Sequence, residues 1–182
     1  NKPLLIEMFY TITCTSIYII NFEYYAVAFR QASIPDSLIG PIYAGFMLIN
    51  SVGVLIYQRK SLSPVRNLLL ILSPFSFVLI ISGYPPAVLA AVVIQQLCYS
   101  YYNCNFEIYV LDSIDDLSQS SYFQSTIGFI NVVNRMTLTL IVTALFARIS
   151  FEWTYIVFAL IILGASLCKA ALSRLEARKR EL

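Results

Sequence analysis

GPIYAGFMLINSVGVLIYQ, residues 40–58, contains no charged side chain and is followed directly by Arg59 and Lys60. An α-helix needs roughly 20 predominantly apolar residues to cross the hydrocarbon core of a bilayer. This run has that length, and two adjacent cations are unfavourable in hydrocarbon. The stretch therefore predicts a transmembrane helix that ends at a basic loop.

Five more apolar runs lie before and after this one and leave little sequence between them. The chain has 182 residues, of which 59% are hydrophobic and 12% charged, whereas a soluble domain is about a quarter charged. We therefore predict an all-α integral membrane protein, a single bundle of six transmembrane helices over residues 1–182 with a cytoplasmic tail at 171–182. The predicted spans are 5–29, 40–58, 67–83, 87–109, 124–147 and 152–170.

The basic residues favour one side of this six-span arrangement. Arg30 and Arg148 fall on one side and Arg135 lies inside the fifth span, whereas the other nine of the 12 Lys and Arg residues fall on the opposite side. Cytoplasmic loops carry the excess of Lys and Arg in membrane proteins, so we predict that the N and C termini are both cytoplasmic. The nine residues are Lys2, Arg59, Lys60, Arg66, Lys169, Arg174, Arg178, Lys179 and Arg180.

An even number of spans allows two groups of three with opposite orientation. The second and fifth spans share a short similarity, Ile49-Asn50-Ser51-Val52 against Ile130-Asn131-Val132-Val133. Inverted repeats of this kind are common in transporters. We therefore predict a 3+3 inverted repeat.

Small residues recur along the second span, at Gly40, Gly45, Ser51 and Gly53. In lipid, small residues let two helix backbones approach closely. We therefore expect close helix contacts at these positions.

Polar side chains are concentrated in the first, fourth and fifth spans. Such groups are costly in lipid and usually face packed helices or a water-filled cavity. In the first span they follow one helical face. Two interpretations stay open: packing between helices with satisfied hydrogen bonds, and contact with a solute. The candidates for a solute cavity are Tyr18, Asn21, Tyr25, Gln95, Tyr99, Tyr102, Asn103, Asn131 and Arg135.

Arg135 is the most costly residue in the predicted spans. If the hydrocarbon begins near Thr126, Arg135 lies about 13 Å deep by helical rise, where a charge must be solvated or paired. Structural pairing and a role in a cavity are both open. Glu23 is expected to pair with Arg30 near the outer end of the first span, and Glu23 and Glu107 are the candidate proton-coupling residues.

The sequence contains no recognisable catalytic or metal-binding motif. There is no histidine, and the four cysteines have no zinc-ligand spacing. We expect no enzyme activity, no metal, no cofactor and no nucleic-acid partner.

Several segments from the fourth to the fifth span resemble a known family. They are Glu107–Val110, the acidic segment Asp112–Asp116, and Phe123–Asn131, while Gly53–Lys60 resembles a glycine-and-basic loop. Together with the order of spans, which covers nearly the whole chain, they resemble the C-terminal six-helix half of a major facilitator superfamily transporter. Gln124 stands where that family commonly has arginine, and Phe129 stands near a position where it has serine.

The resemblance implies an architecture and a function. The six spans would correspond to transporter helices seven to twelve, with the first and fourth lining a central path and the third and sixth peripheral. The expected function is secondary transport of a small solute by alternating access, in a bacterial-type plasma membrane as a multi-pass protein. The partners would be the lipid bilayer, the solute and an N-terminal six-helix half of the same full-length chain.

Two alternatives remain from the sequence. The chain could be a stand-alone six-span substrate-binding subunit of a multi-component transporter, since its length suits that role. It could also be an inactive truncated fragment, because residue one is asparagine and not methionine.

Overall fold

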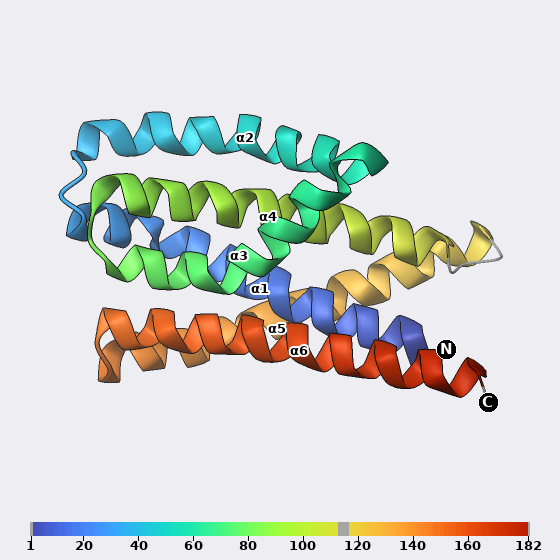
Figure 1. Ribbon diagram of the computed structural model, residues 1–182. Helices are drawn as coiled ribbons and strands as arrows, with labels where there is room; N and C mark the ends of the chain where they lie inside the picture. Colours follow the sequence, from blue (N-terminus) through green and yellow to red (C-terminus); the bar gives the residue numbers. More distant parts are fainter. Residues whose placement is uncertain (1, 113–116, 182) are drawn as a thin grey trace.

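Six α-helices, joined by short links, run back and forth along a common direction (Figure 1). The computed structural model describes the backbone of residues 2–112 and 117–181 and the side chains of residues 6–59, 61–104, 125, 126 and 128–172. Within these parts there is no β-strand. The elements are α1 (Lys2–Gln31), α2 (Asp36–Gln58), the 3₁₀ turn η1 (Lys60–Leu62), α3 (Ser63–Ile81), α4 (Pro85–Asp112), α5 (Leu117–Arg148) and α6 (Phe151–Glu181).

The predicted spans each fall on one helix, and most helices extend beyond them. The exception is α3, which ends at Ile81 and not at residue 83. The reason is Gly83, which has a φ of +62°, a left-handed conformation that ends a helix and that glycine adopts at little cost. The helix α6 continues without a break to Glu181.

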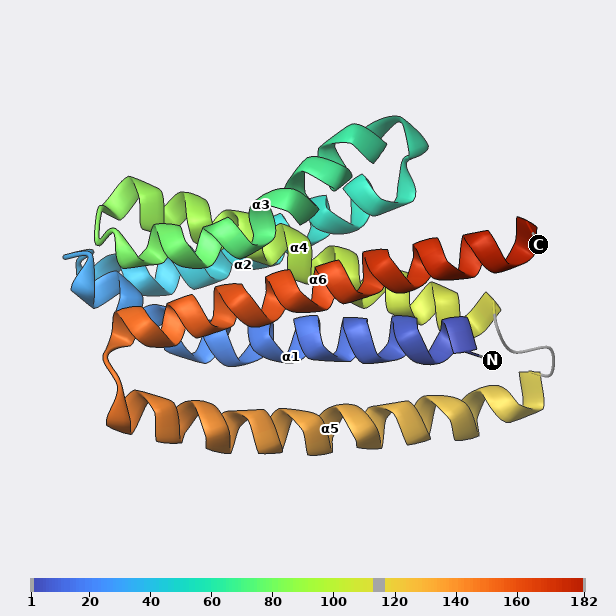
Figure 2. The ribbon, with the colours of Figure 1, turned by 60° about the horizontal axis from the view of Figure 1, so that its bottom comes forward.

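The helices α1 and α4 form the centre of the bundle. The helix α4 packs against α1, α2 and α3, and α1 packs against α4, α5 and α6. The helix α3 also packs against α6, whereas α5 lies along one side of α1 (Figure 2). The start of α1 and the end of α6 lie at the same end of the bundle (Figure 1).

Burial follows this arrangement. Among the described residues, the largest fully buried side chains belong to α1, α3, α4 and α6, and none belongs to α2 or α5. Among the side chains of α5 that the structure describes, Val142 is the only buried one, and α2 buries only Phe46 and Gly53. The helices α2 and α5 therefore expose large apolar side chains over much of their surface, as expected of a membrane-embedded protein.

Four helices are long and apolar enough to cross a bilayer: α2, α3, α6 and the part of α5 from Gly128 to Arg148. This indicates a membrane-embedded protein. The described parts of α1 and α4 fall below the same hydropathy level. Their polar side chains are mostly covered by neighbouring helices, so these two helices do not have to be apolar all round.

Only one of the small residues on α2 makes the predicted close contact. A Cβ atom added to Gly53 would lie 2.7 Å from Cβ of Ser100 and 3.1 Å from the carbonyl oxygen of Leu97, both on α4. At Gly40 and Gly45 an added Cβ would meet nothing within 4 Å. The prediction was therefore right for Gly53 and wrong for the other two glycines, because α2 presents only one face to α4.

Candidate functional site

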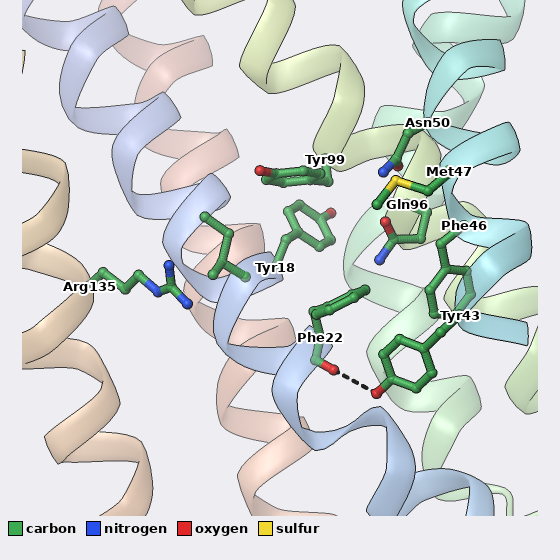
Figure 3. Close-up of a pocket in the computed structure, with 10 residues that line it drawn as sticks. Tyr18, Phe22, Tyr43, Phe46, Met47, Asn50, Gln96, Tyr99 and Arg135 are labelled. Carbon is green, nitrogen blue, oxygen red and sulfur yellow. Dashed lines mark hydrogen bonds between the residues drawn. The ribbon is translucent and has the colours of Figure 1, made fainter. Parts of the chain in front are cut away.

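A pocket of about 230 Å³ opens between the central helices and their neighbours (Figure 3). Its walls come from α1, α2 and α4, with one side chain from α5, and none comes from α3 or α6. The lining residues are Tyr18, Ile19, Phe22, Tyr43, Phe46, Met47, Asn50, Gln96, Tyr99 and Arg135.

Aromatic rings hold α1 against α2 at one end of the pocket. The ring of Phe22 lies 5.0 Å from that of Tyr43 and 5.9 Å from that of Phe46, both edge to face. Tyr43 and Phe46 are themselves 5.2 Å apart. Such contacts add to the gain from burial alone, and they leave ring faces and edges along the pocket wall (Figure 3).

Hydroxyl groups of the lining tyrosines on α1 and α2 are already used within the bundle. The hydroxyl of Tyr18 hydrogen-bonds with that of Ser73 on α3. The hydroxyl of Tyr43 donates to the carbonyl oxygen of Phe22 at 3.0 Å. These bonds fix the two rings in place and reduce the number of hydroxyl groups that a solute can engage.

Two carboxamides add uncharged polar groups to the tyrosine hydroxyls of the pocket. Asn50 on α2 accepts a 2.9 Å hydrogen bond from Ser100 at its side-chain oxygen, and Gln96 on α4 is buried. A carboxamide has two donors and two acceptor lone pairs. Asn50 therefore keeps further donor and acceptor capacity, and Figure 3 shows both amides on the pocket side that faces Tyr18 and Tyr99.

Arg135 is the one charged residue among those that line the pocket, and it is paired. Its guanidinium donates to Glu23 at 2.6 Å, joining α5 to α1, with both side chains about half exposed. The expected pair between Glu23 and Arg30 is wrong, because Arg30 binds Asp36 at 3.0 Å across the α1–α2 turn. The pocket is thus left without an unpaired charge.

Three of the predicted cavity residues form a buried cluster between α1 and α4, outside the pocket wall. The side-chain oxygen of Gln95 accepts from the amide of Asn21 at 2.6 Å and from the hydroxyl of Tyr25 at 2.8 Å. All three side chains are fully buried. Their role in this structure is to join the two central helices.

Other predicted residues lie in different places. Tyr102 bonds to Tyr10 at 2.8 Å between their hydroxyls and is buried, and Tyr18 and Tyr99 line the pocket. Asn103 is exposed and Asn131 is half-buried, and neither lines the pocket. Glu107 falls on α4 outside the residues whose side chains the structure describes.

The site also contains residues that the sequence did not single out, above all Phe22, Tyr43, Phe46 and Met47. In an apolar run such side chains look the same whether they face lipid, a core or a cavity. Usable signals were the polar residues within apolar runs, Asn50 in the second span and Gln96 in the fourth.

A second ion pair was also missed. Glu7 on α1 binds Lys169 on α6 at 2.8 Å, with side-chain exposures of 13% and 30%. The ammonium of Lys169 lies 4.4 Å from the ring centre of Tyr10, in reach of a cation–π interaction. Among the described residues, this is the most buried of the three ion pairs that α1 makes with later helices.

Chemically, the pocket offers stacking surface and hydrogen bonds, which suit reversible binding. Among the side chains that the structure describes, no group of three or more Cys, Asp or Glu side chains is placed to hold a metal ion. Comparisons of the chain with protein-family models, with curated proteins and with solved structures found no match.

Proposed function

We propose that the protein is a secondary transporter, or the C-terminal half of one, that moves a small solute across a membrane by alternating access. The observation that carries this proposal is the pocket itself. Its tyrosines and carboxamides come from α1, α2 and α4, Arg135 comes from α5, and α3 and α6 contribute no lining residue. Solute sites near the bilayer midplane, between packed helices, are typical of secondary transporters.

The packing of the helices supports six spans in a 3+3 inverted repeat. Exchanging α1 with α4, α2 with α5 and α3 with α6 turns the contact of α2 with α4 into that of α5 with α1. The contact of α3 with α4 becomes that of α6 with α1, and that of α2 with α3 becomes that of α5 with α6. The contacts of α1 with α4 and of α3 with α6 map onto themselves, and α1 and α4 run in opposite directions (Figure 1).

The positions of the basic residues support cytoplasmic termini. The start of α1, the end of α6 and the α2–α3 link lie at one end of the bundle (Figure 1), and Arg59 belongs to that link. Arg30 and Arg148 end α1 and α5 at the opposite end. By the excess of positive charge on cytoplasmic loops, the first end is the cytoplasmic one, in a bacterial-type plasma membrane.

Alternating access requires a second body that rocks against this bundle. We assign that role to an N-terminal six-helix half in the full-length protein, which would close over the pocket. Exposed side chains beside the pocket support this, since Met47 is 73% exposed while lining it. Glu23, bound to Arg135, is the described candidate for proton coupling, and Glu107 is the other.

Uptake by the full-length protein in sealed proteoliposomes tests the proposal. A solute from a panel that stabilises the purified protein on heating is loaded on one side, and exchange of radiolabelled solute is followed. We expect exchange without any added energising subunit, its loss in Gln96→Leu, and its retention in Phe75→Leu on the outer face of α3. Binding without exchange would contradict transport and favour the stand-alone binding subunit.

A further inference from the structure

We propose that the pocket binds a neutral, planar nitrogen heterocycle of about the size of a nucleobase. This inference rests on the proposed function and names the class of solute that the same pocket would select. It follows from the charge, the ring surfaces, the hydrogen-bonding groups and the volume of the pocket.

Charge selects against ionic solutes. Arg135 is the only charged residue lining the pocket, and Glu23 neutralises it at 2.6 Å. An ionic solute would lose hydration and find no free counter-charge among the residues that line the pocket, and burying an unpaired charge is costly. To bind an anion through Arg135, the protein would have to give up the pair with Glu23.

Ring surfaces select a flat solute. Five of the ten lining residues are aromatic, and they come from three helices: Tyr18 and Phe22 from α1, Tyr43 and Phe46 from α2, and Tyr99 from α4. A planar ring can contact several of these surfaces at once. Stacking of a base on an aromatic side chain is sequence-tolerant and strong for its area.

Hydrogen-bonding groups select a heterocycle over a sugar. The hydroxyls of Tyr18 and Tyr43 are engaged with Ser73 and with a backbone carbonyl, so the other uncharged polar lining residues, Asn50, Gln96 and Tyr99, are the ones that would recognise a solute. Two carboxamides match a ring edge with adjacent donors and acceptors. They do not satisfy a polyol, which would bury several hydroxyls without partners.

The volume of the pocket limits the size of the solute. The pocket holds about 230 Å³, close to the lower end of small-molecule sites, which begin at roughly 300 Å³. A volume near this lower end favours a solute with one single or fused ring system.

Calorimetric titration of the purified full-length protein with four probes tests this class. The probes are adenine (neutral, planar), benzoate (planar anion), benzamidine (planar cation) and glucose (neutral polyol). We expect adenine to bind at least about tenfold more tightly than each of the other three. Tighter binding of benzoate, benzamidine or glucose, or no adenine binding by a protein that melts cooperatively, would overturn the inference.

Two variants locate the binding. Phe22→Leu keeps an apolar side chain but removes a ring, and we expect it to weaken adenine binding about fivefold or more. Phe75→Leu makes the same change on the outer face of α3, where Phe75 is 60% exposed, and should leave binding unchanged. If the two variants weaken adenine binding equally, adenine does not bind in the pocket.

Glu23→Gln is expected to increase the affinity for an anion, an effect that loss of a purely structural residue would not produce. It frees Arg135 from its partner, so benzoate should bind about tenfold more tightly than to the wild type. No gain for benzoate in a variant that still binds adenine would contradict the account of the charge.

Exchange assays separate this inference from the proposed function. Adenine that binds the pocket without being exchanged across proteoliposome membranes overturns transport and leaves the class of ligand in place. Exchange of glucose or benzoate, with no exchange of adenine, supports transport and overturns the class of solute.

Discussion

The inner helices α1 and α4 are less apolar than the outer helices α2 and α5, yet they are the more deeply buried pair. The described parts of α1 and α4 fall below the hydropathy expected of a membrane span, yet they hold most of the largest buried side chains. The helix α2 and the described part of α5 exceed that hydropathy but bury almost nothing.

This difference teaches where the chain can carry polar groups. A helix exposed to lipid has to be apolar on its surface, because lipid offers no hydrogen bonds. A helix surrounded by other helices can carry Asn, Gln and Tyr, since its neighbours supply the partners, as Gln95 does for Asn21 and Tyr25. The polar helices are therefore the inner ones, and the pocket forms where their cover is incomplete.

The largest loss of stability is expected from enlarging Gly53, where the outer helix α2 contacts the inner helix α4. We expect Gly53→Val to destabilise the protein by about 3 kcal/mol, because the new Cβ would lie 2.7 Å from Ser100. Unfolding in mixed detergent micelles measures the loss. Gly45→Val is the matched control, since its Cβ meets nothing within 4 Å, and a similar loss there would refute a specific contact at Gly53.

A second change tests the polar centre itself. Gln95→Leu keeps the volume but removes the acceptor used by Asn21 and Tyr25, so that two buried donors lose this bond. We expect a loss of about 2 kcal/mol, as orphaned donors cost ~1–3 kcal/mol each and somewhat less in membrane proteins. The same substitution at the exposed Gln58 should change stability by less than about 0.5 kcal/mol. If the two variants melt alike, Gln95 does not join the central helices.

Two acidic residues of α1 form ion pairs with later helices, and the two pairs differ in burial. Glu7 is 13% exposed and Lys169 30%, whereas Glu23 and Arg135 are about half exposed. We expect Glu7→Gln to cost about 1.5 kcal/mol and Glu23→Gln about 0.5 kcal/mol. Double-mutant cycles with Lys169→Gln and Arg135→Gln measure the two coupling energies. A stronger coupling for the exposed pair would contradict the burial seen here.

A small increase in stability is expected from a substitution in the turn that follows α1. Ser33 follows α1 with a φ of 58°, and the amides of Ser33 and Ile34 bond to the carbonyls of Arg30 and Phe29. This is a helix C-terminus that favours glycine. Ser33→Gly should stabilise the protein by about 0.5–1 kcal/mol, read as a higher melting temperature. A drop would mean that the serine hydroxyl has a role of its own.

The helices could be predicted from the sequence because the apolar runs and the turn residues between them are local signals. The shared polar face of α1 was predicted for the same reason, although packing and solute contact were both open, and Tyr18, Asn21 and Tyr25 are all buried, as is Cys14 on the same face. Helical periodicity alone puts these four residues on one side.

The site could be predicted only in part. The partner of Arg135 is Glu23, 112 positions away in the chain, and no local pattern indicates which helices lie side by side. Likewise Gly53 and Gly45 look alike in sequence, and only the position of α4 distinguishes them. The wall that α2 gives to the pocket was missed because Tyr43, Phe46 and Met47 suit lipid as well as a cavity.

Cysteine accessibility tests the central claim most directly, namely that the face bearing the pocket meets water while the outer face of α3 meets lipid. In a cysteine-free background, Met47→Cys and Ile71→Cys place thiols at residues that are 73% and 63% exposed and near the middle of their helices. A charged, membrane-impermeant thiol reagent reacts with a thiolate, which forms in water and not in hydrocarbon. We predict that in intact membranes the thiol at position 47 is labelled and the thiol at 71 is not. Equal labelling, or labelling at 71 alone, would contradict the account.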